Sequence, residues 1–590
     1  MRTHRSASAA ALATVCLFAA CATAQGPRPG GAPAPAAANP CAYRPINVAP
    51  RSQGGYGQEP FRNPPELLAR NGVLTTDLRV QYTDKATTSI GGCPVRLRSY
   101  NGALVGPTLR VRPGDTIAPL LNNRLPAETP AQVRSQFLQE DTVAFLDMRP
   151  YSFNTTNLHT HGLHVSPNGN SDNVLLAIPP QDTLRYSIAL PADHTRGSYW
   201  YHAHTHGSTA IQVGSAMAGA LVVEDDPNTI PASLRAANER EKVLVIQTIL
   251  YDTAGESENI AAFFPDGSNS PALCAQGSPN CTWLSSNRQV TINGQIVPVI
   301  RMRPGEVQRW RLVDGSFRET MAIRLQGHAL HEIATDGLYT GRVDTWRDGQ
   351  PIILYPGYRS DVLVQAGMPG RYQLVDDSAS AAKGLRGVAE DANLIAILEV
   401  AGPRVPMRLP TTAEMAPLAP FAGVDLSTTA TGVQEAVFKL GSGMQSANPR
   451  NSFEINYSAF NESRTRYLEL DSIDMWSLTT VGDPAAVQGG NGIPPLPHVF
   501  HIHINPFQVS RTGPDGRAQW VWKDTQFIPG GDTVTVYTQY TDFTGSFVIH
   551  CHILDHEDLG MMETVEVVKE MPRPHPRPDG APAGHAHGSH

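Results

Sequence analysis

The sequence predicts an all-β fold made of several sandwich or barrel domains. Short runs of β-branched and aromatic residues, bounded by Gly, Pro and Asp, recur along the chain, for example SYWYHAH, GALVVED, DTVTVYTQY and SFVIHCH. Such runs are typical of sandwiches and barrels. The 590 residues, of which 41% are apolar and 17% charged, are enough to bury the cores of three or four soluble domains.

An internal repeat supports this domain count. One set of residues recurs after 191 to 192 positions, about the length of one β-domain. Its members are Asn101, Gly102, Val105, Pro107, Arg110, Arg112, Pro113, Gly114 and Asp115, matched by Asn293, Gly294, Val297, Pro298, Arg301, Arg303, Pro304, Gly305 and Glu306. LHTHGL also resembles FHIHIN, and YHAH resembles IHCH. The first and last domains therefore share motifs that the middle domain lacks.

The N-terminal residues 1–24 have the pattern of a secretory signal peptide. Arg2 and Arg5 precede an apolar run over 9–20, and small residues lead to a cleavage point after Ala24. The run is too short to span a membrane, and without a twin-arginine pair we expect export before folding. The protein is therefore expected to be periplasmic or secreted. A lipoprotein acylated at Cys21 is the alternative.

After cleavage five cysteines remain, an odd number in a compartment where thiols pair. One arrangement joins Cys41 to Cys93 and Cys274 to Cys281 and leaves Cys551 free, although the sequence does not fix the pairing. Residues 25–60 form an N-terminal arm with a flexible start, and the His- and Pro-rich residues 571–590 are expected to be a disordered tail. The net charge of −8 and the absence of basic blocks exclude nucleic acid and anionic membrane surfaces as partners.

The histidines are concentrated in H-x-H pairs. Twenty histidines would give roughly 0.7 such pairs by chance, whereas the sequence contains six. Alternate side chains of a β-strand share a face, so each pair can present two imidazoles to one metal ion or to two adjacent ions. Imidazole is a suitable ligand for copper.

A second ligand set surrounds one of these pairs. Cys551 lies between His550 and His552, His556 follows five residues later and Met561 ten residues later. Together with His498, these residue types are those of a blue-copper site, which uses a thiolate, two imidazoles and a weak thioether. Because Cys551 points away from its two neighbours along a strand, we expect its copper on one face and a histidine-bound cluster on the other, with a short stretch of backbone between them.

With these motifs, which occur in order from Leu158 to Met561, the chain resembles a three-domain multicopper oxidase of the laccase type. The resemblance implies four copper ions. A type 1 copper would be bound by His498, Cys551 and His556 with Met561 axial, and a type 2 copper by His159 and His501. A type 3 pair would be bound by the remaining six, His161, His202, His204, His503, His550 and His552. Met562 and Leu559 are the alternative axial residues.

The resemblance also implies three cupredoxin-like Greek-key β-sandwich domains, over 61–226, 227–402 and 403–570, with a trinuclear cluster between the first and third. The middle domain would bind no copper. Its phrases RMRPGEVQRWRLVDG and GHALHEIATDG resemble the family's middle domain, so His328 and His331 are expected to be structural. His164, His194 and His206 are expected to lie beside the site or at the surface, and His585, His587 and His590 of the tail either capture copper or have no specific role.

The reaction implied by the resemblance is the oxidation of a substrate, one electron at a time, at the type 1 copper, with four electrons reducing O₂ to two waters at the cluster. The protons require carboxylates nearby, for which Asp172 and Glu557 are the candidates; the alternative is that both are solvated loop charges. Because Met-rich inserts that would collect Cu(I) are absent, phenols and aromatic amines are favoured as substrates over the metal ions Cu(I), Fe(II) or Mn(II).

A non-catalytic copper carrier is disfavoured because it would need only the Cys551 site and would leave eight histidines unexplained. The segment from Gln132 to Phe153 and the GDPAAVQGGNGIPPLP loop before His498 are expected to shape access to the type 1 site. The protein is expected to act as a monomer, with O₂ and a small-molecule or metal-ion reductant as its partners and no transmembrane segment.

Overall fold

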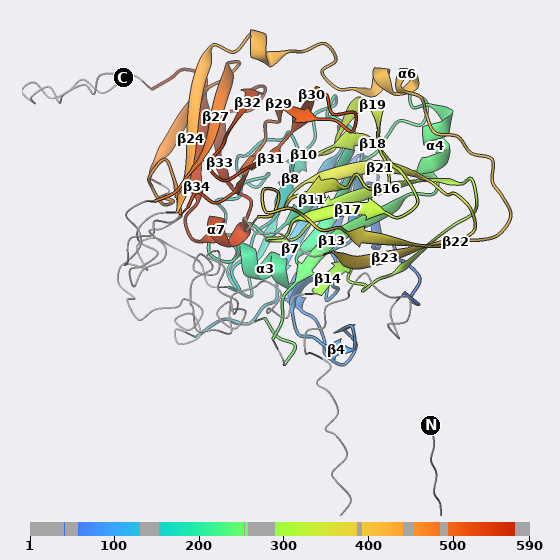
Figure 1. The fold of residues 1–590 in the computed structure, drawn as a ribbon. Helices are drawn as coiled ribbons and strands as arrows, with labels where there is room; N and C mark the ends of the chain where they lie inside the picture. The colour runs from blue at the N-terminus through green and yellow to red at the C-terminus, as the bar shows by residue number, and fades with distance from the viewer. Residues whose placement is uncertain are drawn as a thin grey trace, which may run out of the picture. The chain divides into compact units, whose positions relative to one another are not determined.

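The computed structural model describes residues 41, 57–129, 153–252, 254–257, 289–385, 392–440, 453–461, 463–483 and 494–572. Strands make up most of the regular structure in these ranges, and the helices are few and short (Figure 1). The all-β prediction is therefore confirmed. No helix in the described part of the chain is long and apolar enough to cross a membrane.

The strands form three successive pairs of sheets, which we call the first, second and third domains. In the first domain the sheets have the orders β1-β6-β12-β11-β8 and β10-β7-β2-β5, with β9 also paired to β7 and a small β3-β4 hairpin apart. The bounds are β1 Glu66–Leu68, β2 Val73–Tyr82, β3 Ser89–Ile90, β4 Cys93–Pro94, β5 Arg98–Tyr100, β6 Thr108–Val111, β7 Thr116–Asn123, β8 His159–His161, β9 Thr183–Arg185, β10 Ile188–Ala189, β11 Gly197–His202 and β12 Ala218–Val223.

The second domain has the sheets β14-β13-β16-β21-β18-β19 and β15-β23-β22-β17-β20. Its strands are β13 Lys242–Ile249, β14 Gln289–Ile292, β15 Val299–Met302, β16 Val307–Asp314, β17 Met321–Leu325, β18 Leu330–Thr335, β19 Leu338–Trp346, β20 Ile352–Leu354, β21 Arg359–Gln365, β22 Gly370–Asp376 and β23 Asn393–Val400.

The third domain repeats this arrangement in the sheets β25-β24-β27-β32-β29-β30 and β26-β34-β33-β28-β31. Its strands are β24 Gly432–Leu440, β25 Phe453–Ile455, β26 Thr465–Glu469, β27 Ile473–Val481, β28 His498–Ile502, β29 Phe507–Thr512, β30 Ala518–Lys523, β31 Thr525–Ile528, β32 Thr533–Gln539, β33 Gly545–Cys551 and β34 Met562–Val568. The helices are α3 Thr209–Ser215, α4 Ala232–Asn238, α6 Thr412–Met415 and α7 Leu554–Asp558, with 3₁₀ turns η3 Ala416–Leu418 and η4 Leu426–Thr428.

The pattern of buried residues along a strand shows whether the strand lies at the outside of the protein or between domains. In β27 every second residue is buried, as expected for a strand with one face on the core and one toward solvent. In β11 and β12 every residue is buried on both faces, because β11 also packs against β16 and β21 of the second domain. The strand that carries His202 therefore lies inside the assembly of domains.

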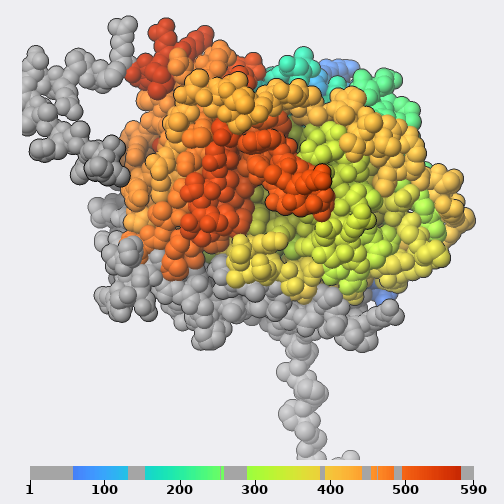
Figure 2. Space-filling view, turned by 45° about the horizontal axis from the view of Figure 1, so that its top comes forward, coloured from blue at the N-terminus to red at the C-terminus, as the bar shows by residue number. Residues whose placement is uncertain are grey.

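The second and third domains are also in direct contact. The β29-β30 hairpin, in orange-red in Figure 2, lies against the yellow-green strands of the second domain, where β30 packs on β18 and β19. Arg511 of β29 forms ion pairs of 2.9 Å with both Glu332 and Asp344 of the second domain. The middle domain is thus tied to the third domain by buried charges as well as by chain connectivity.

Three of the five cysteines lie among the described residues, and they agree with the pairing that the sequence suggested. Cys41 and Cys93 form a disulfide, and Cys551 is buried with a free thiol. Cys274 and Cys281 lie outside the described residues, as do the signal segment, most of 132–153, residues 484–493 of the loop before His498, and the three tail histidines.

Candidate copper sites

Eight histidines from the first and third domains meet in one buried cluster. Their exposed fractions are all 2% or less. Two pairs of rings stack across the domain boundary: His159 on His503, with centroids 4.0 Å apart, and His161 on His501, with centroids 3.9 Å apart. The structure therefore brings together all eight histidines that the resemblance assigned to the trinuclear cluster, which are His159, His161, His202, His204, His501, His503, His550 and His552.

The strand geometry differs from the sequence prediction at three of the four motifs. Only the first H-x-H pair lies wholly on a strand, β8. The other strands end inside or just before the second histidine: β11 ends at His202, β28 at Ile502 and β33 at Cys551. Only one motif therefore lies wholly within a strand, whereas His204, His503 and His552 stand one or two residues beyond the ends of β11, β28 and β33.

The hydrogen bonds of these rings leave nitrogen atoms available for a metal. Nδ1 of His159 lies 3.0 Å from a carboxylate oxygen of Asp172, and Nδ1 of His202 lies 2.8 Å from the Ala203 carbonyl. An acceptor at Nδ1 places the proton there and leaves the lone pair on Nε2. Nε2 of both rings is buried and has no partner among the described residues, as expected of a ligand atom.

Three further ring nitrogens converge at distances that suit a shared metal ion. Nε2 of His550 lies 3.1 Å from Nε2 of His204 and 3.3 Å from Nε2 of His503. Nitrogens bound to one ion at about 2.0–2.1 Å, the length of a zinc–imidazole bond, lie roughly 3 to 3.4 Å apart. Burial lowers the pKa of all three rings, and neighbouring histidines lower it further, so the rings are neutral and keep lone pairs for a cation. This donor set fits copper.

A second set of ligands lies on the other side of Cys551. The thiol sulfur is 3.5 Å from Nδ1 of His498 and 3.8 Å from Nδ1 of His556, and the two nitrogens are 3.3 Å apart. Burial raises the pKa of the Cys551 thiol to about 12, so a bound cation is needed to hold it as a thiolate. The residues fit a type 1 copper.

Of the two adjacent methionines, Met561 is the one that packs in the same core as Cys551. It is fully buried in the same hydrophobic cluster as Cys551, and its carbonyl accepts the Cys551 N–H at 3.0 Å. Met562 belongs to a different cluster, with Val174, Phe460 and Val548. Packing thus favours Met561 over Met562, and its role as axial ligand stays a prediction.

Two carboxylates predicted beside the cluster are both buried, so neither is a solvated loop charge. Asp172 also accepts the backbone N–H of Thr160 at 2.8 Å, and burial raises its pKa to about 7. Glu557 is fully buried, with its two oxygens 3.4 Å and 3.3 Å from Nδ1 of His204 and His550. Burial, and then the neighbouring Asp558, raise its pKa.

A third carboxylate, Asp524, was missed by the sequence analysis. Its side chain lies 3.0 Å from Nε2 of His161, and its backbone carbonyl 2.8 Å from Nδ1 of His501. Burial raises the pKa of Asp524, but the guanidinium of Arg359, together with His501 and the Thr525 hydroxyl, lowers it by more, so the net shift is downward. No motif surrounds it, since it falls between β30 and β31 far from any H-x-H pair; only the topology brings it to the cluster.

The other histidines have partners away from both sites. His164 contacts Asp542, and its backbone N–H donates to Nε2 of His194. His206 packs edge-on against Phe460. In the second domain, Nε2 of His328 accepts the Gly367 N–H at 3.0 Å, and Nδ1 of His331 lies 3.0 Å from a Thr345 hydroxyl. Structural roles for these two rings stay a prediction.

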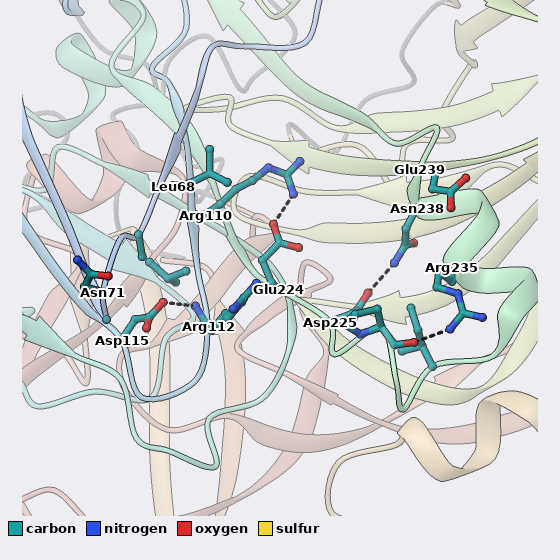
Figure 3. A pocket seen from close by; sticks show the side chains of 15 residues that line it. Leu68, Asn71, Arg110, Arg112, Asp115, Glu224, Asp225, Arg235, Asn238 and Glu239 are labelled. Carbon is teal, nitrogen blue, oxygen red and sulfur yellow. Dashed lines mark hydrogen bonds and ion pairs between the residues drawn. The ribbon is translucent and has the colours of Figure 1, made fainter.

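A cavity of about 640 Å³ opens where the first domain meets α4, and none of the cluster histidines lines it (Figure 3). Its charged lining residues are largely paired with one another: Arg110 with Glu224, Asn238 with Asp225, and the Arg112 N–H with Asp115. No histidine, cysteine or methionine lines the cavity, so it is separate from both ligand sets.

Comparison with known proteins agrees with this geometry. Three family models described as multicopper oxidase match residues 138–228, 264–402 and 433–571. A multicopper oxidase of Staphylococcus aureus is 22% identical over 80% of this chain and 83% of its own length, and a laccase of Bacillus subtilis is 22% identical over 80% and 90%. The solved structure of a multicopper oxidase from Campylobacter jejuni, titled a metallo-oxidase, covers 89% of this chain and 98% of its own with a TM-score of 0.64 and 22% identity.

The described sheets and these structural neighbours show that the three domains are cupredoxin-like. The family binds copper and uses O₂ as the electron acceptor, and the buried histidine and cysteine clusters of this chain supply the donors that copper requires. The chain belongs to the multicopper oxidase family and is an oxidoreductase.

Proposed function

We propose that the chain oxidises a small reductant, one electron at a time, beside His498, Cys551 and His556, and passes the electrons to O₂, which is reduced to water among the eight clustered histidines. One observation carries this proposal. Cys551 contacts the first ligand set, while His550 and His552, its neighbours in the chain, both lie in the second.

The residues divide into three ligand groups under this proposal. His498, Cys551, His556 and Met561 would hold a type 1 copper, and His159 and His501 a type 2 copper. Six would hold a type 3 pair, namely His161, His202, His204, His503, His550 and His552. When bound, copper would supply one-electron redox chemistry that no amino-acid side chain of either site provides by itself.

The chain offers two short paths for electrons between the sites. One is covalent, from the Cys551 side chain through its backbone to His550 and His552. The other is a hydrogen bond, because Nδ1 of His550 lies 3.1 Å from the Cys551 carbonyl. Both paths start at the same cysteine, so substrate oxidation and O₂ reduction stay apart in space but are linked by one residue.

Protons would reach the cluster through its buried carboxylates. Glu557 touches His204 and His550, and it accepts a hydrogen bond of 3.1 Å from the Thr209 hydroxyl of α3. Asp172 touches His159. The two carboxylates thus contact rings in different parts of the cluster, and each is placed to give or take a proton there.

For the reductant we propose phenols and aromatic amines. The chain has 13 methionines, scattered except for Met561 and Met562, so it lacks a methionine-rich segment that would collect Cu(I). One relative is named a laccase, whereas one structural neighbour is titled a metallo-oxidase. Oxidation of Cu(I), Fe(II) or Mn(II) is the alternative.

Oxygen uptake by the copper-loaded protein tests both the oxidase activity and the choice of reductant. We expect uptake with a phenol and with an aromatic diamine, each faster than with Cu(I), and none by the copper-free protein with any of them. If oxygen uptake is fastest with Cu(I), the proposed organic substrates are wrong and a metal ion is the reductant. Uptake with none of the three would contradict the oxidase proposal.

We also propose that the protein acts outside the cytoplasm. The N-terminal signal pattern and the Cys41–Cys93 disulfide support this, because disulfides form and persist in oxidising compartments.

A further inference from the structure

Arg359 stands at the point where all three domains meet, next to the histidine cluster. It is the first residue of β21 in the second domain and is 1% exposed. Its Nη1 and Nη2 atoms bind the two oxygens of Asp524 in the third domain at 2.8 and 2.6 Å. This is a bidentate, charge-assisted pair, the strong form of an arginine–carboxylate contact.

The remaining donors of Arg359 reach the first domain and the backbone of its own domain. Nε donates to the Ser198 carbonyl of β11 at 3.3 Å, and Nη1 and Nη2 also donate to the carbonyls of Gly357 and Asp336 at 3.0 and 2.8 Å. All five N–H groups of the guanidinium are therefore used. Because the side chain is also buried, these contacts fix it in one position.

Asp524, held in this way, orients histidines from both sides of the cluster. One carboxylate oxygen faces Nε2 of His161 at 3.0 Å and also accepts the Thr525 hydroxyl at 2.7 Å. The carboxylate keeps the proton of His161 on Nε2 and leaves Nδ1, which is buried and has no partner among the described residues, as the free ligand atom. The Asp524 carbonyl does the reverse for His501, holding its proton on Nδ1.

Two glycines show that the backbone is shaped around this contact. Gly162, next to His161, has φ +90°, and a Cβ there would overlap the guanidinium of Arg359 and the carboxylate of Asp524. Gly357, two residues before Arg359, also has φ +90°, and a Cβ there would lie 3.1 Å from the rings of His161 and His552. The turn of the second domain thus lies directly against two cluster histidines, where only glycine leaves room.

From these contacts we propose that the second domain, which contributes no copper ligand, is a working part of the cluster: Arg359 is a positioning residue that acts through Asp524 to set the ligand nitrogens of His161 and His501. The proposal rests on the proposed assignment of the eight histidines to copper. It makes the contact of Arg359 with Asp524 a condition for copper retention at the cluster, whereas the hydrogen bonds of Arg359 reach none of the ligands around Cys551.

The test compares Arg359→Gln and Arg359→Lys with a matched control. Arg511→Gln removes another arginine, half-buried, whose ion pairs join the second and third domains, but Arg511 touches no cluster histidine. All variants are loaded with copper, dialysed against a chelator, and measured by metal analysis, by the electron paramagnetic resonance signal of type 2 copper and by the blue absorption of type 1 copper.

We expect Arg359→Gln to lower copper affinity at the cluster roughly 10- to 100-fold and to change or remove the type 2 signal, with the blue absorption retained. Arg359→Lys keeps the charge without the bidentate contact, so its copper content and type 2 signal should lie between those of Arg359→Gln and the wild type. Arg511→Gln should keep both signals.

The inference is overturned if Arg359→Gln keeps the full copper content and an unchanged type 2 signal. It is equally overturned if Arg511→Gln loses cluster copper to the same extent, since general loosening of the interface would then suffice. A wild-type protein without cluster copper would instead refute the proposed function.

Discussion

Replacing Cys551 by serine is expected to abolish the blue colour and reduce oxygen uptake to background, while copper stays bound at the cluster. Serine cannot supply the soft thiolate that a type 1 copper needs, and it removes the start of both electron paths. The cluster nitrogens do not contact the sulfur, so total copper should fall by only about one ion per chain. Visible absorption, metal analysis and oxygen uptake on the same sample measure the three effects.

The control for this variant is His164→Ala, which removes a histidine that lies outside both sites and contacts Asp542. It should keep its colour, its copper and its activity. A blue colour that persists in Cys551→Ser would show that the type 1 assignment is wrong, and loss of all copper would show that the two sites are not independent.

Replacing Glu557 by glutamine is expected to slow turnover by about 10²- to 10³-fold, within the range for removal of one proton-transfer group. Glutamine has the same shape and can still accept the Thr209 hydroxyl, but it cannot exchange a proton at neutral pH. Reduction of the type 1 copper by substrate without oxygen should proceed as in the wild type. Stopped-flow records of the blue colour, first without O₂ and then with it, separate the two half-reactions.

Glu563→Gln is the matched control for this variant. Glu563 lies on β34, pairs with Arg466 and contacts no cluster histidine. It should leave both half-reactions unchanged. If Glu557→Gln returns to blue in O₂ as fast as the wild type, Glu557 does not carry protons to the cluster.

The strand pattern predicted the all-β fold, and the histidine motifs carried the family resemblance that implied the gathering of the ligands. Runs such as SFVIHCH contain both the alternation of a strand and the ligands themselves, so local sequence predicts local structure and chemistry together. The alternation argument succeeded for His159 and His161, which share β8. For His204 the strand itself is shorter than expected, because β11 stops at His202, although the two rings still lie side by side with centroids 5.6 Å apart.

The residues that the sequence did not reveal act through tertiary contacts. Asp524 and Arg359 are 165 positions apart and carry no local motif, so only the packing of the second domain against the third shows that they pair. Gly162 and Gly357 resemble ordinary turn glycines until the side chains that fill the space beside them are seen. The prediction of a copper-free middle domain stays, but that domain turns out to contact the cluster directly.

The central claim is that one chain joins single-electron oxidation to the complete reduction of O₂ through Cys551. The most direct measurement is the number of substrate electrons consumed for each O₂ molecule, with hydrogen peroxide assayed in the same solution. The arrangement of a cysteine-linked site and an eight-histidine cluster predicts four electrons per O₂ and no peroxide. Two electrons per O₂ with an equal yield of peroxide would contradict it.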